Sequence, residues 1–175
     1  MKNIFPNFDV NVINYDLSDY RIVGQYNSRS DVIVLDKSLN KLSPLYRQIV
    51  LLHEMFHSTL SPKRTLRLER LISQFGQFKK GSLSYKVEEC IAEICTMVAC
   101  LKMGTLNPYT RLIIEEGLQD NYTKGMYIPW KEVVSCLTYF SNEEIDFTKE
   151  LDFVKCYMIA KYDMNIKSSY VKIAG

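Results

Sequence analysis

The stretch Ser43-Pro-Leu-Tyr-Arg-Gln-Ile-Val-Leu-Leu-His53-Glu54-Met-Phe-His57-Ser-Thr-Leu60 decides how this 175-residue chain is organised. A serine followed directly by a proline is typical of the first turn of a helix. Apolar residues then recur every three to four positions, at Leu45, Ile49, Leu52, Phe56 and Leu60. This spacing predicts an amphipathic helix with one apolar face, ended by Ser61-Pro62.

The two histidines of this helix, His53 and His57, are the only histidines in the chain, and Glu54 follows the first of them. Residues four apart on a helix are neighbours on one face, so two imidazoles at this spacing can bind one zinc ion. A glutamate beside that metal can deprotonate a zinc-bound water. The pattern therefore predicts a zinc site with Glu54 as general base. The alternatives are hydrogen-bonded core histidines or surface imidazoles without a metal.

A third metal ligand has to come from elsewhere, because catalytic zinc sites use three protein ligands and a water. No third histidine exists, so the ligand is a carboxylate or a thiolate. The best source is a helix predicted from about residue 84 to 103, where Glu88, Glu89 and Glu93 interrupt an apolar sequence. Glu89 and Glu93 are four apart and share a face. We expect Glu88 to face solvent or Lys86. A structural zinc site with four protein ligands is a further alternative.

Strand patterns precede the central helix and helical patterns follow it. Strands are predicted at 8–13, 20–26 and 31–36, as a hairpin or adjacent antiparallel strands. A basic amphipathic segment, 63–75, leads to further helices at 84–103, 108–119, 130–141 and 143–162. We therefore expect an α+β chain, with a small antiparallel-type sheet (mainly strands, 1–42) packed on a mostly helical body (43–164). The connector 121–129 leaves too few residues after it for a second core, so 1–175 is predicted to be a single domain.

Composition excludes several classes of protein. Hydrophobic residues make up 47% and charged residues 24%, as in ordinary globular domains. The net charge of +2 creates no strong field toward nucleic acid or anionic lipid. The five cysteines form no CxxC pair, and we expect them to be reduced thiols without a metal. No secretory signal and no apolar stretch of membrane-spanning length occur, so we expect a cytoplasmic protein with no membrane contact.

Three stretches carry a family resemblance: GQYNSRSDVIVLD (24–36), LLHEMFHST (51–59) and SYKVEECIAEICTMVACLKMG (84–104). In order and spacing they resemble the metallopeptidase domain of ArdC-type antirestriction proteins of plasmids and phages, which is similar to the gluzincin branch of zinc peptidases. A looser resemblance is to ImmA/IrrE-like peptidases, which cut transcriptional regulators. The resemblance covers about residues 20–105. It implies a zincin-like fold, zinc ligands His53, His57 and Glu89, Glu54 as general base, and Glu93 as an acid that orients a histidine.

Binding to nucleic acid has weaker support. Full ArdC-type proteins have an N-terminal domain for single-stranded DNA, whereas only about fifty residues precede the HExxH motif here, so that property does not transfer. A basic stretch lies between the two helices that are predicted to carry the metal ligands. It could contact nucleic acid or an acidic partner, or it could be a solvated face. Its residues are Lys63, Arg64, Arg67, Arg70, Lys79 and Lys80.

We expect a zinc-dependent metallopeptidase of a phage or mobile element that acts on a host or regulatory protein. An extended protein or peptide substrate would lie along an edge strand, for which 31–36 is the candidate, with contacts to Ile33, Val34 and Leu35. Tyr26, Tyr46 or Tyr85 could stabilise an oxyanion, although core packing is the commoner role. The alternative function is a non-catalytic, zincin-fold antirestriction or anti-defence protein that acts by binding.

Overall fold

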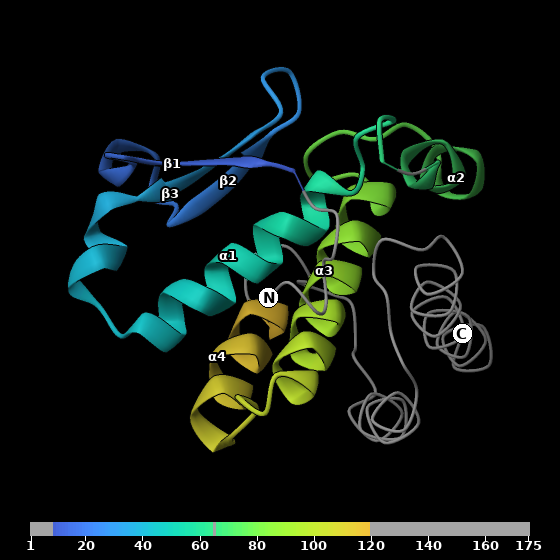
Figure 1. Ribbon diagram of the computed structural model, residues 1–175. Coiled ribbons are helices and arrows are strands. Elements are labelled where there is room, and N and C mark those ends of the chain that lie inside the picture. The colour runs from blue at the N-terminus through green and yellow to red at the C-terminus, as the bar shows by residue number, and fades with distance from the viewer. Residues whose placement is uncertain (1–8, 65, 120–175) are drawn as a thin grey trace.

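The computed structural model describes residues 9–64 and 66–119 (Figure 1). This part is α+β, as predicted, with a three-stranded mixed sheet and four helices. The order is β1 (Asn11–Tyr15), β2 (Gly24–Asn27), β3 (Val32–Asp36), α1 (Pro44–Ser58), α2 (Arg67–Phe75), α3 (Leu83–Lys102) and α4 (Pro108–Gln119), with short 3-10 helices at Ser18–Tyr20 and Lys37–Lys41. The predicted connector 121–129 and helices 130–141 and 143–162 lie outside the described residues.

The sheet has the order β1-β3-β2. β2 and β3 form the predicted antiparallel hairpin, but β1 runs parallel to β3. The prediction of an antiparallel-type sheet is therefore wrong for β1. The chain leaving β1 passes through the 3-10 helix and enters β2 at the opposite edge, so it reaches β3 from the far side and β3 becomes the central strand. A period-two pattern shows that strands exist but does not determine their order.

Helix α1 lies between the sheet and the other helices, as Figure 1 shows, and contacts β2, β3, α3 and α4. Its start is as predicted, because the Ser43 hydroxyl accepts a hydrogen bond from the N–H of Leu45, with Pro44 at the first helical position. The apolar side chains of Leu52 and Phe56 are completely buried. α1 thus lies at the centre of the described core and carries the HExxH motif there.

Helix α3 runs beside α1 and contacts it directly, while α2 and α4 pack against α3 (Figure 1). The Ser82 hydroxyl caps its first turn by accepting a hydrogen bond from the N–H of Tyr85. Gly104 follows its end with φ of 67°, a left-handed conformation that glycine adopts without strain. Of the described helices, none is long and apolar enough to cross a membrane.

A salt bridge ties the β2–β3 turn to the end of α1. Asp31 in this turn has φ of 56°, a conformation that aspartate tolerates better than most residues. Its two carboxylate oxygens accept hydrogen bonds from Arg64 at 2.7 and 2.9 Å. Arg64 also donates to the carbonyl oxygen of Ser58 at the end of α1 and to that of Asp9 before β1. One arginine thus links three segments that are distant in sequence.

Candidate metal centre

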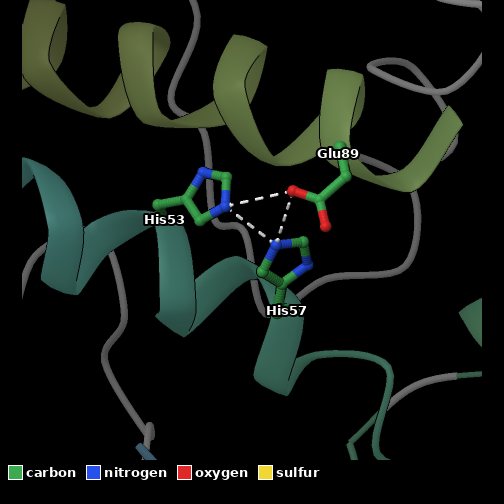
Figure 2. A group of neighbouring side chains, drawn as sticks. All are labelled: His53, His57 and Glu89. Atoms are coloured by element: carbon green, nitrogen blue, oxygen red, sulfur yellow. Dashed lines mark hydrogen bonds and ion pairs between the residues drawn. The ribbon is translucent and has the colours of Figure 1, made fainter. Parts of the chain in front are cut away.

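The side chains of His53, His57 and Glu89 converge between α1 and α3 (Figure 2). The two histidines lie on the face of α1 that is turned toward α3, one helical turn apart. Glu89 comes from the first half of α3 and is buried. The imidazoles keep a little exposure, with 16% and 13% of the His53 and His57 side chains accessible. The three residues therefore form a shielded group that solvent still reaches.

The distances between their ligand atoms match those of a zinc site. The two Nε2 atoms lie 2.9 Å apart, and Glu89 Oε2 lies 3.4 Å from His53 Nε2 and 3.3 Å from His57 Nε2. Ligand atoms about 2.0–2.1 Å from a tetrahedral zinc are roughly 3.3 Å from one another. A zinc ion fits among these three atoms with little movement, and among the described residues no fourth side chain joins the group.

The other nitrogen of each imidazole lies beside a further carboxylate. His57 Nδ1 lies 3.1 Å from Glu88 Oε1, and His53 Nδ1 lies 3.3 Å from Glu93 Oε1. A carboxylate only accepts hydrogen bonds, so an imidazole that pairs with one through Nδ1 carries a proton on that nitrogen. In neutral imidazoles both Nε2 atoms are then acceptors, and they face each other and the Glu89 carboxylate. Three acceptors at such distances need a proton or a metal ion between them.

The charges of neighbouring side chains shift the pKa values of His53 and Glu89. Burial by itself lowers the pKa of His53, but the carboxylates of Glu93 and Glu89 outweigh it and hold that pKa well above the ordinary histidine value. Burial likewise opposes ionisation of Glu89, yet the imidazoles of His57 and His53 hold the Glu89 pKa well below its usual range. Both shifts have the same cause, because the carboxylates around the imidazoles favour positive charge at this position.

Glu54 reaches the edge of β2 and also lies close enough to His53 for its charge to raise the pKa of that imidazole. It is buried, and its Oε2 accepts a 2.7 Å hydrogen bond from the backbone N–H of Tyr26 in β2. The same carboxylate lies against Gly24, where a Cβ atom would come within 3.1 Å of Glu54 Oε1 and 2.7 Å of Val50 Cγ1. The backbone of β2 therefore fixes the position of the predicted general base.

Glu88 is not where the sequence placed it. We expected it to face solvent or Lys86, but it is completely buried, contacts His57 Nδ1 and forms an ion pair with Arg67. The signal was available, because Ile91 and Cys95, three and seven positions later on the same helix face, are core residues. Arg67 gave no such signal, since it stands among other basic residues. The Nδ1 atom of each histidine thus lies beside a carboxylate, Glu88 for His57 and Glu93 for His53, whereas only Glu93 was predicted to orient a histidine.

The predicted substrate strand is also wrong. Val34 belongs to β3, which is paired on both sides and offers no free edge. Ile33 and Leu35 are completely buried in the core beneath the sheet. Their apolar, β-branched-rich sequence indicated a strand, and such a sequence is more typical of a central than of an edge strand. Among the described strands it is β2 that has its edge beside Glu54.

Two charges of the predicted basic stretch are engaged inside the protein. Arg64 binds Asp31, and Arg67 binds Glu88 while only 6% exposed. Neither guanidinium is placed to bind a phosphate. Tyr26, one of the tyrosines considered for an oxyanion, donates its hydroxyl hydrogen bond to Asp31 at 2.7 Å, so it is not directed at the metal group in this conformation.

Comparison of the chain with protein-family models, with curated proteins and with solved structures gave no match.

Proposed function

We propose that this protein is a zinc-dependent peptidase, with His53, His57 and Glu89 as metal ligands and Glu54 as general base. One observation carries the proposal: three ligand atoms from two helices lie 2.9–3.4 Å from one another, at the spacing of a tetrahedral zinc with one open position. A structural zinc would require a fourth protein ligand. Among the described residues, the group able to hold a metal has three members.

A zinc ion at this position supplies a Lewis acid and lowers the pKa of a water to about 7. Glu54 accepts a proton from the attacking water and delivers it to the leaving amine, as a general base and then a general acid. The N–H of Tyr26 keeps the Glu54 carboxylate oriented between these steps. Glu88 and Glu93 hold the two imidazoles with Nε2 toward the metal.

The substrate we propose is an extended peptide that lies along the edge of β2. β2 is an edge strand and reaches Glu54, whereas β3 is paired on both sides. A strand edge binds a peptide through backbone hydrogen bonds and accepts many side chains. The zincin-like fold, and an origin in a phage or mobile element, belong to the same proposal and are supported by the resemblance of residues 20–105 to ArdC-type domains.

The test compares the wild-type protein with Glu54→Gln in a host-cell lysate, with and without a chelator, and identifies new peptide ends by mass spectrometry. A peptidase gives cleavages that disappear with the chelator and with Glu54→Gln, although this variant still binds zinc. A protein that binds zinc but shows no chelator-sensitive cleavage is not a peptidase on the proteins tested. Full antirestriction or anti-defence activity of Glu54→Gln in cells would favour the binding function.

A further inference from the structure

We propose that Arg67 is a positioning residue of the metal centre: it fixes Glu88, Glu88 fixes the imidazole of His57, and α2 thereby sets how tightly zinc is held. The inference rests on the proposed zinc site but not on peptidase activity. It assigns a role to an arginine that the sequence presented as part of a solvated basic stretch.

Glu88 is the central member of this chain of contacts. None of its surface is exposed, one carboxylate oxygen lies 3.1 Å from His57 Nδ1, and the other faces the Arg67 guanidinium in an ion pair. A carboxylate removed from water in this way needs a positive partner and filled hydrogen-bonding positions. Arg67 supplies the charge, so Glu88 does not require the metal as its counter-ion. A bound zinc ion would then pair with the carboxylate of Glu89.

Arg67 is itself held at the end of the metal helix. Its Nη1 donates to the carbonyl oxygen of Phe56 at 3.1 Å and to the Thr59 hydroxyl at 2.5 Å. Phe56 precedes His57 directly, so one guanidinium contacts both the backbone beside this ligand and the carboxylate behind its ring. A planar fork of donors can make these contacts together, whereas a lysine ammonium cannot reach them with the same geometry.

Arg67 begins α2, and α2 packs against α3. The arginine therefore connects three helices at one point: it stands on α2, bonds the end of α1 and pairs with an acid of α3. Displacement of α2 would pull the guanidinium from Glu88 and release the His57 ring. Mutation of a group that orients a metal ligand typically reduces metal affinity 10–100-fold.

The rival explanation is that Arg67 only stabilises the fold. Arg64 provides the matched control, because it also bonds a carbonyl at the end of α1, that of Ser58, and is also paired with a carboxylate. Its partner Asp31 bonds the hydroxyl of Tyr26 and not a ligand imidazole. Loss of Arg64 should loosen the same helix end without touching the ring of His57.

The experiment measures the zinc affinity of the full chain by competition with a chromophoric chelator, together with the visible absorption of the Co²⁺ form. The variants are Arg67→Met, Glu88→Gln, the double variant and Arg64→Met. We expect Arg67→Met and Glu88→Gln each to weaken zinc binding 10–100-fold and to change the Co²⁺ spectrum. The double variant should be no weaker than the worse single one, since the two residues act as a unit. Arg64→Met should stay within about threefold of wild type.

An Arg67→Met protein with wild-type affinity, or with the same loss as Arg64→Met, would overturn the inference. Should Arg67→Met fail to fold, as judged by circular dichroism, Arg67→Lys replaces it. Arg67→Lys must bind zinc more weakly than wild type, because an ammonium group cannot contact Glu88 and the Phe56 carbonyl together; equal affinity contradicts the proposal. A wild-type protein that takes up no zinc refutes the proposed function itself, which is a different result.

Discussion

At the scale of single residues, contacts with the backbone of β2 set the position of the Glu54 carboxylate. This carboxylate rests against β2, bonded by the N–H of Tyr26 and in contact with Gly24, which has no side chain to push it away. Glu54 is thus positioned by backbone, and backbone geometry tolerates less adjustment than a flexible side chain does. The histidines are positioned differently, through the carboxylates behind their rings.

Replacing Gly24 by alanine should damage catalysis and spare the metal. The new Cβ would lie 2.7 Å from Val50 Cγ1 and 3.1 Å from Glu54 Cγ, so the strand or the glutamate must move. We expect kcat/KM on a cleaved peptide to fall by about tenfold or more, because a small misplacement of a catalytic group is costly. Zinc affinity should change less than twofold. Gln25→Ala, on the exposed face of the same strand, is the control. Unchanged activity in Gly24→Ala would show that Glu54 is not held by β2.

The two acids on one edge of α3 should rank clearly in zinc binding. Glu89→Ala removes a proposed ligand and is expected to abolish stoichiometric binding, whereas Glu93→Ala, which removes the carboxylate beside His53 Nδ1, should weaken it by about 10–100-fold. Elemental analysis and chelator competition on both variants measure this. The reverse order would mean that Glu93 is the ligand and that the observed pairing changes when the metal binds.

At the scale of the elements, the periodic apolar residues predicted α1, α3 and α4 within a residue or two, and the Ser43-Pro44 pair predicted the start of α1, whereas the Ser82 cap of α3 was not predicted. The order of the strands, and therefore which strands lie at the edges of the sheet, could not be predicted. Pairing depends on the path that the chain takes between β1 and β2, and the pattern within a strand does not contain that path. The candidate ligands were named from the spacing of His53 and His57 and from the family resemblance, and α1 and α3 bring these residues together. The Arg67–Glu88 pair could not be found, since α2 has to fold against α3 before these residues meet.

The turn between β2 and β3 should make the fold sensitive to acid. Hydrogen bonds from Arg64 hold the pKa of Asp31 below its ordinary value of 3.8. A carboxyl group whose pKa is lower in the folded state stabilises the protein above the unfolded pKa and loses that effect as pH falls through the folded pKa. We therefore expect the Tm of wild type to fall below about pH 4. Asp31→Asn should have a lower Tm at pH 7 and a shallower fall, as measured by thermal unfolding. Parallel curves for the two proteins would assign the acid sensitivity to other carboxylates, such as Asp36.

At the scale of the whole described structure, His53, His57 and Glu89 join α1, which supports the sheet, to α3, against which α2 and α4 pack. Zinc should therefore stabilise the global fold and not one loop. At a free zinc concentration about 100 times Kd, a ligand specific for the folded state adds about 2.7 kcal/mol to the free energy of unfolding. We expect a corresponding rise in Tm that EDTA reverses and that His57→Ala lacks. A zinc-induced rise of equal size in His57→Ala would place the bound metal elsewhere.

The position of the metal group between α1 and α3 also bears on folding kinetics. His57 and Glu88 are separated by thirty-one positions, whereas the β2–β3 hairpin and the first turns of each helix close over a few residues. Contacts between distant residues require costly loop closure and tend to form after local ones. Zinc would then bind after the rate-limiting barrier to folding, so its effect would fall on the unfolding rate and leave the folding rate nearly unchanged. The zinc-bound protein would unfold slowly because its activation barrier to unfolding is high. Such kinetic stability slows proteolysis that requires unfolding.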